Sequence, residues 1–149
     1  MLFQKDINLE IGIKVVIPIL KLGPYLFLLF LSLYIFGITL GLFVSAGLLR
    51  YGPAFENIAW SSLFLLAPLG CIYYPIEILP EFFQIIAKGL PLVYIFDETR
   101  NILLNGSVNY ENIKQAYLLN LIYLFGGIGL FYLSFLRARV KGTLINMGE

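Results

Sequence analysis

Hydrophobic residues along this chain gather in long runs that contain no charged residue. Three such runs extend over 23–49, 57–76 and 115–136. A helix needs about 20 apolar residues to cross the hydrocarbon core of a bilayer. Each run is long enough to predict one membrane-spanning helix. The pattern therefore predicts an all-α integral membrane protein with three full transmembrane helices over these ranges.

Prolines and charges interrupt the chain between the second and third runs, over 77–104. The stretch from Pro80 to Lys88 begins with proline and an acid and ends with a base and a glycine, which are ordered signals of a short helix. Pro91 opens a second short helix that closes near Asn105. Neither piece is long enough to span. We predict a re-entrant hairpin of short helices leaning against the spans, with an amphipathic lid on the surface as the alternative.

Prolines also occur near and within the predicted spans. Pro24 suits the first turn of the first span, and Pro68 is expected to kink the second. Residues 1–22 are apolar in part, but Lys14, Pro18 and Lys21 interrupt them. This segment is interpreted as an interfacial segment or a partial span.

The composition supports the membrane assignment and narrows the chemistry. The chain is 60% hydrophobic and 13% charged, whereas a soluble domain carries about 25% charged residues. The formal net charge of +1 suggests no basic surface for nucleic acid. With no histidine and a single cysteine, Cys71, neither an internal disulfide nor a Cys/His metal site is expected. No catalytic constellation is evident, so we expect no enzyme activity and no cofactor.

Basic residues immediately after the third span predict the topology. Arg137, Arg139 and Lys141 place the segment 137–149 in the cytoplasm as a tail, because cationic residues beside a span are retained on that side. Three spans then put the turn after Arg50 in the cytoplasm and the prolines of 77–104 outside. The expected location is the plasma (inner) membrane, as a multi-pass protein with the lipid bilayer around it.

Small and charged residues supply the candidate contacts. Gly37, Gly41 and Ser45 follow one another at four-residue spacing, a stripe that allows close approach of a second helix, although glycine is common in membrane helices. Arg100 has the spacing to form an ion pair with Asp97. Asp97 and the adjacent Glu98 are otherwise interpreted as solvated carboxylates.

The turn after the first span contains a second charged candidate. Glu56 follows Arg50 by six residues, so the two could fix the turn against a partner. Alternatively Glu56 is an acid at a helix N-terminus, where the helix dipole favours negative charge.

The run from Phe36 to Arg100 resembles the C-terminal half of ABC-2-type transporter permeases, the membrane subunits of ATP-driven exporters. The matching pieces are FGITLGLFVSAGLLRYGPAFENIAW, LAPLGCIYYPIEILPEFFQIIAKGLP and YIFDETR. They contain an Arg-Tyr-Gly turn, a Tyr-Pro, two Leu-Pro pairs and an aromatic–acid–x–x–Arg ending in the family's order. Asp97 stands where the family usually has Glu.

The resemblance implies roles for particular residues. A cytoplasmic turn of Arg50, Tyr51, Gly52 and Glu56 would face a separate ATP-binding cassette ATPase, which would hydrolyse the ATP. Re-entrant helices with Pro75, Pro80, Pro91, Asp97 and Arg100 would close the outer end of the translocation path. A second permease copy is expected as a partner. Family members have six spans, so this chain corresponds to a truncated or C-terminal part, with an N-terminal half supplied separately. A small membrane scaffold or a non-functional permease remnant is the alternative.

Overall fold

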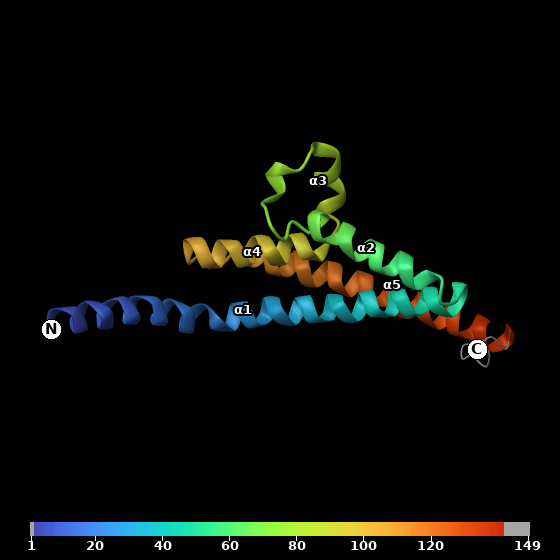
Figure 1. The fold of residues 1–149 in the computed structure, drawn as a ribbon, viewed down its shortest axis with the longest axis horizontal. Helices are drawn as coiled ribbons and strands as arrows, with labels where there is room; N and C mark the ends of the chain where they lie inside the picture. The colour runs from blue at the N-terminus through green and yellow to red at the C-terminus, as the bar shows by residue number, and fades with distance from the viewer. Residues whose placement is uncertain (1, 142–149) are drawn as a thin grey trace.

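The computed structural model describes residues 2–141, with side chains from Leu22 to Val140. The described part of the chain is all-helical. Its elements are α1 (Leu2–Tyr51), α2 (Phe55–Leu69), the 3-10 helix η1 (Ile76–Ile78), α3 (Glu81–Ala87), α4 (Pro91–Asn105) and α5 (Tyr110–Lys141). Figure 1 shows α1 and α5 as the two long elements of an elongated bundle, with α3 standing off its side. The all-α prediction is confirmed.

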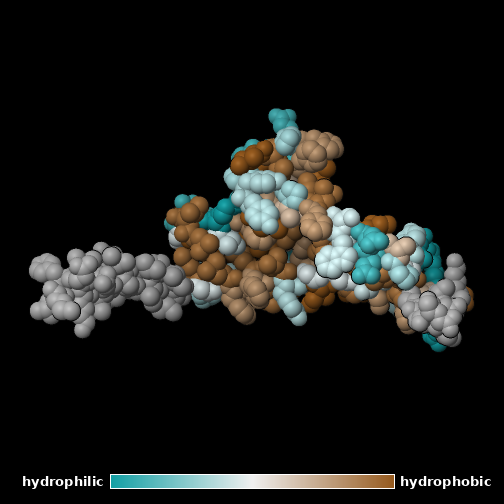
Figure 2. All heavy atoms as spheres, in the orientation of Figure 1, coloured by the Kyte–Doolittle hydropathy of each residue, from teal (hydrophilic) through white to brown (hydrophobic). Residues whose placement is uncertain are grey.

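Two of these helices are long and apolar enough to cross a membrane, namely Leu22–Tyr51 within α1 and Tyr110–Val140 within α5. They match the first and third predicted spans. Figure 2 shows hydrophobic side chains over the middle of the bundle, which fits a surface that faces lipid. These observations make the chain a candidate membrane protein.

The second predicted span, 57–76, is not confirmed. Helix α2 has 15 residues and ends at Leu69, so it is about 22 Å long against a hydrocarbon core of about 30 Å. The helix stops one residue after Pro68, and Gly70 and Cys71 then form a turn in which Cys71 has a φ of 54°. Pro68 therefore lies at the end of a helix and does not kink a longer one.

The N-terminal segment is helical and joins the first span without a break, which fits both an interfacial segment and a partial span. Residues 2–21 continue the same helix as the first span, so the chain has no boundary at 22 and Pro24 is not in a first turn. A proline removes one backbone hydrogen bond of a helix, and the turns on either side still propagate. Helix α5 likewise begins at Tyr110, five residues before the predicted start at Gln115, and continues beyond 136. Residues 142–149 of the predicted tail lie outside the described residues.

Helices α1 and α5 are parallel neighbours. Tyr117 Oη donates to the Leu28 carbonyl at 2.8 Å, and Asn120 Nδ2 donates to the Ser32 carbonyl at 2.8 Å, with sequence separations of 89 and 88. Such a constant offset requires two helices that run in the same direction. Continuing the offset of 88 puts Arg50 level with residue 138. The basic ends of α1 and α5 therefore lie together, as Figure 1 shows near the C-terminus.

The seam between α1 and α5 consists mostly of small and polar residues, with Leu29 and Phe36, at spacings of three, four or seven residues. Its buried members are Leu29, Ser32, Phe36, Thr39 and Ala46 of α1 and Ala116, Asn120, Gly127, Ser134 and Ala138 of α5. Such spacing repeats about every 3.5 residues and keeps one face of each helix against the other. Of the predicted stripe of Gly37, Gly41 and Ser45, the two glycines are not in this seam, since a Cβ at either position meets nothing within 4 Å, and Ser45 is half-buried.

Because α1 and α5 run in the same direction, the chain must run back after α1 to the level where α5 begins. It does so in two helices, α2 and α4. Helix α2 runs back along α1 after a three-residue turn, and α4 runs back along α5 before the turn at 106–109. Residues 70–90, with η1 and α3, project sideways between these two helices in Figure 1. We call residues 70–90 the excursion. The two predicted short helices are confirmed, because α3 matches 80–88 and α4 runs from Pro91 to Asn105 with Gly106 as a left-handed cap.

Candidate functional site

The excursion breaks the helical hydrogen-bond pattern, and side chains supply donors to its backbone carbonyls. Four carbonyls of the excursion accept such bonds: Leu79 from Gln84 (2.8 Å), Lys88 from Tyr94 (3.0 Å), Cys71 from Arg100 (3.1 Å) and Gly89 from Tyr123 (3.1 Å). The Pro68 carbonyl at the end of α2 accepts from Tyr74 (3.0 Å) and also from the Cys71 backbone N–H (3.2 Å). A carbonyl without a partner is costly in a low-dielectric environment. The break is therefore a built feature, held partly from α4 and α5.

A small apolar core closes the base of the excursion. Cys71, Ala87 and Val93 are buried there, with Ile76, Leu79 and Leu90 packed around them. Cys71 lies outside both candidate spanning helices. Burial raises the pKa of its thiol, and the positive charge of the nearby Arg100 guanidinium lowers that pKa only in part. Cys71 is therefore a packing residue of this core.

Polar side chains meet at the corner where α4 leads into α5. Glu98 is completely buried, and its carboxylate accepts hydrogen bonds from the Asn109 backbone N–H (2.7 Å) and from Asn112 Nδ2 (3.1 Å). Asn112 also approaches the Asp97 carboxylate at 3.4 Å. The prediction that Asp97 and Glu98 are both solvated was wrong for Glu98, because the buried face of α4 passes through that position.

Arg100 does not form the predicted ion pair with Asp97. In the part of the chain with described side chains, the ion pair is that of Lys114 and Glu111, at 4.0 Å. Arg100 instead donates from Nη2 to the Cys71 carbonyl, and its buried Nη1 has no acceptor among the described residues. The guanidinium reaches across to the excursion because the broken turn at Cys71 presents a free carbonyl.

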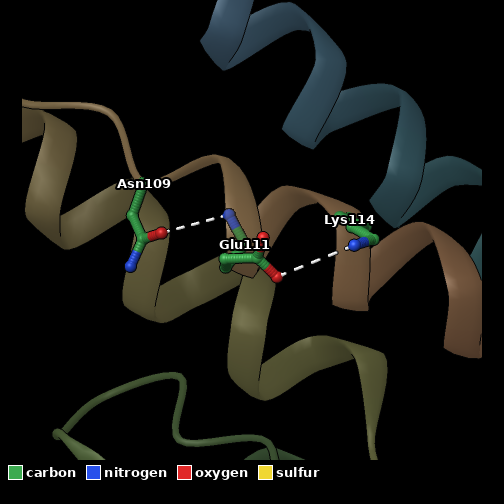
Figure 3. A network of polar contacts seen from close by, with 3 residues as sticks. All are labelled: Asn109, Glu111 and Lys114. Carbon is green, nitrogen blue, oxygen red and sulfur yellow. Dashed lines mark hydrogen bonds and ion pairs between the residues drawn. The ribbon is translucent and has the colours of Figure 1, made fainter.

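The turn that starts α5 is organised by Asn109. Its Oδ1 accepts from the Glu111 backbone N–H at 3.0 Å, and the exposed Glu111 carboxylate faces Lys114 one turn later (Figure 3). This side-chain cap satisfies a free N–H at the start of the helix. The Asn109 side chain is therefore held in place while its Nδ2 group remains without a partner among the described residues.

A hollow of about 570 Å³ lies between the corner and the excursion. Its polar lining consists of Glu77, Asp97, Arg100, Asn101, Asn105, Asn109 and Asn112, and Pro75 and Leu104 complete it. We call it the polar hollow. It brings together Pro75, Asp97 and Arg100 of the predicted gate residues. Pro80 caps α3 away from it, and Pro91 is buried at the first turn of α4.

The predicted ATPase-facing turn lies at the opposite end of the bundle. Gly52 has a φ of 74°, which explains a glycine there. The Tyr51 and Phe55 rings stack with centroids 5.9 Å apart, and the Arg50 guanidinium lies 5.5 Å from the Tyr51 ring centre. Arg50 and Glu56 are exposed and form no ion pair with each other or with another described residue. The idea that these two charges fix the turn together is not supported within this chain.

The comparisons with known proteins identify no relative. The chain matches no protein-family model, no curated protein and no solved structure. The case for a function therefore depends on the sequence pattern and on the geometry described above.

Two buried polar residues were missed by the reasoning from sequence. Glu98 lies on the face of α4 that also carries Ile95 and Ile102, and this three- and four-residue spacing was a signal that could have indicated its burial. Asn120 lies within an uncharged run, where it was treated as part of an apolar span. Its Nδ2 donates to both the carbonyl and the Oγ of Ser32, each at 2.8 Å.

Proposed function

We propose that this chain is a membrane-spanning permease subunit, or the C-terminal part of one, of an ABC-2-type exporter. It would move substrate outward using ATP that a separate ATP-binding cassette subunit hydrolyses. The observation that carries the proposal is the interrupted return path with its capped carbonyls. Half-length helices joined by an irregular segment are typical of transporters, because helix ends and unwound backbone form binding sites where they line a cavity.

The charge distribution supports the orientation in this proposal. Arg50 is level with the segment that carries Arg137 and Arg139, and all three are exposed at one end of the bundle. Cationic residues beside spans favour the cytoplasmic side. The turn at Gly52 would then be available to an ATPase subunit, and the polar hollow would face outward.

A membrane scaffold is the second candidate. The open face at Gly37 and Gly41, where an added Cβ would meet nothing within 4 Å, favours it. Small residues let another helix approach closely, and a scaffold needs only such contacts. An exporter also accommodates this face, since a second permease copy would cover it. The two functions differ in whether ATP, bound by a partner subunit, changes the conformation of this chain.

The test uses single cysteines in a Cys71→Ala background. Glu56→Cys places a reporter in the predicted ATPase-facing turn, and Leu104→Cys places an exposed control at the other end. In membranes of the source cell, a cysteine-reactive cross-linker at position 56 is expected to capture an ATP-binding cassette ATPase. Labelling of position 56 is expected to change when ATP and vanadate are added.

The control position decides between the two functions. Position 104 should capture no ATPase, because it lies at the far end of the bundle. The scaffold would be favoured, and the exporter contradicted, if the chain associates with itself but captures no ATPase. In that case the labelling of position 56 would be the same with and without ATP and vanadate.

A further inference from the structure

We infer that the polar hollow binds a neutral, hydroxyl-rich group such as a sugar ring. This inference goes beyond the exporter role and stands whether or not that role is correct. It follows from which polar atoms in the lining remain unused. The free acceptors are both Glu77 oxygens, Asp97 Oδ1, Asn105 Oδ1 and Asn112 Oδ1, and the free donors are Asn109 Nδ2 and Arg100 Nη1.

This mixture of donors and acceptors selects the class of ligand. A hydroxyl group both donates and accepts, so adjacent hydroxyls on a ring complement carboxylate acceptors and amide donors at once. A carboxylate has two oxygens and can accept from two neighbouring hydroxyls. The hollow's volume of about 570 Å³ lies within the range of about 300–1,000 Å³ typical of small-molecule sites.

Charged ligands fit the lining less well. A phosphate would meet the carboxylates of Glu77 and Asp97, and Arg100 already donates from Nη2 to the Cys71 carbonyl. For a metal ion, the described residues offer no group of three or more His, Cys, Asp or Glu. The guanidinium in the same hollow would also repel a cation. A neutral ligand avoids both conflicts.

The lining is held in position before any ligand arrives. Asn101 is fixed by Asn105 at 3.0 Å and by Ser107, whose hydroxyl and carbonyl bond to it at 3.2 Å. Asn112 is held by the buried Glu98 at 3.1 Å. A site whose side chains are already ordered loses less entropy on binding. The corner is therefore a prepared polar surface.

The test follows the side-chain amides of the hollow by NMR. The full chain, labelled with ¹⁵N and held in phosphatidylcholine nanodiscs, is titrated separately with D-glucose, inorganic phosphate and Mg²⁺. We expect saturable shifts of the Asn105 and Asn109 amide signals with glucose, and none with phosphate or Mg²⁺. The inference would be overturned if phosphate or Mg²⁺ caused such shifts and glucose did not, or if no probe caused them.

A matched pair of variants places the binding in the hollow. Glu77→Ala removes an exposed carboxylate that lines the hollow and has no partner among the described residues, and Glu81→Ala removes an exposed carboxylate of α3 that does not line it. Glu77→Ala is expected to weaken glucose binding about tenfold, because hydrogen bonds to a charged acceptor are lost. Glu81→Ala should leave it unchanged, and equal weakening by both variants would refute the site.

A further experiment distinguishes a glycolipid headgroup from a soluble saccharide as the ligand. Nanodiscs that contain glucosyl-diacylglycerol present the same ring on a lipid. Shifts of the Asn109 amide in these discs without added glucose would support a glycolipid headgroup as the ligand. Shifts with free glucose and none in the glycolipid discs would support a soluble saccharide.

Discussion

The α1–α5 pair and the α2–α4 return occupy the same bundle and satisfy their backbones in different ways. In α1 and α5 most backbone carbonyls are satisfied within a continuous helix, and the two helices are joined by a packed seam with two side-chain hydrogen bonds to α1 carbonyls. The return breaks between Leu69 and Pro91, and side chains donate to its free carbonyls. The pair depends mainly on packing along its whole length, whereas the return also needs side-chain hydrogen bonds at its break. Single substitutions should therefore act differently in the two regions.

Both regions expose apolar side chains, and they differ in the regularity of the backbone beneath them. The excursion exposes Phe82, Ile85 and Tyr73 to 69%, 74% and 81%, although it also carries charged residues at its turns. The α1–α5 pair exposes apolar side chains along its length, such as Phe30 and Phe125. Lipid would cover both surfaces, but only the excursion brings irregular backbone with it. That backbone is tolerable because α4 and α5 cap it.

The largest effect is expected from the buried carboxylate at the corner. Glu98→Ala leaves the Asn109 N–H and the Asn112 amide without their acceptor, so we expect a loss of about 3 kcal/mol in the free energy of unfolding. Denaturation in mixed micelles, followed by circular dichroism, measures it. Glu111→Ala, which removes an exposed carboxylate, should cause no measurable change. Equal effects of the two variants would mean that Glu98 is not buried.

A smaller effect is expected where α2 ends. A Cβ on Gly70 would lie 2.9 Å from both the Leu66 carbonyl oxygen and Leu92 Cδ1. Gly70→Ala is therefore expected to lower the free energy of unfolding by about 2 kcal/mol through overpacking. Gly37→Ala meets open space and should leave the monomer as stable as before. A stable Gly70→Ala protein would show that the return path is looser than described.

Removal of one carbonyl cap should open the excursion locally. Tyr123→Phe deletes the hydroxyl that donates to Gly89, at a cost of about 1 kcal/mol. Hydrogen exchange of the amides in 86–92 should then quicken about fivefold while α1 and α5 keep their protection. Tyr132→Phe, at an exposed tyrosine of the same helix, is the control. Faster exchange throughout α5 would contradict a local role.

The smallest effect is expected in the seam. A double-mutant cycle of Asn120→Ala and Ser32→Ala should give a coupling energy of about 0.6 kcal/mol, the average for side-chain hydrogen bonds between membrane helices. The same micelle denaturation measures it. A coupling of zero would mean that packing of small residues alone holds α1 to α5.

Much of the fold could be predicted because its signals are local. Pro80 and Gly89 bound a short helix wherever it lies in space, and Pro91 and Gly106 bound the next one. The predicted second span failed at Pro68–Gly70, where hydrophobicity continues but the backbone turns. A hydrophobic run indicates that a segment suits an apolar environment, but it does not indicate whether the helix continues through it.

The site could be predicted only in part, since its residues meet through tertiary contacts. Sequence singled out Pro75, Asp97 and Arg100, which do line one hollow. It could not show that Arg100 donates to the Cys71 carbonyl, because that acceptor becomes free only when the excursion breaks the helix. Nor could it show which glycines contact another helix, since Gly127 does and Gly37 does not.

The sequence by itself determined that the chain is helical, strongly apolar and divided by prolines and glycines, because these properties depend on neighbouring residues. The tertiary structure decided that α1 and α5 run in parallel, that α2 stops halfway and that Glu98 and Asn120 are buried. Those outcomes depend on contacts between residues as many as 89 positions apart, and no local pattern specifies which distant partner a polar side chain will meet.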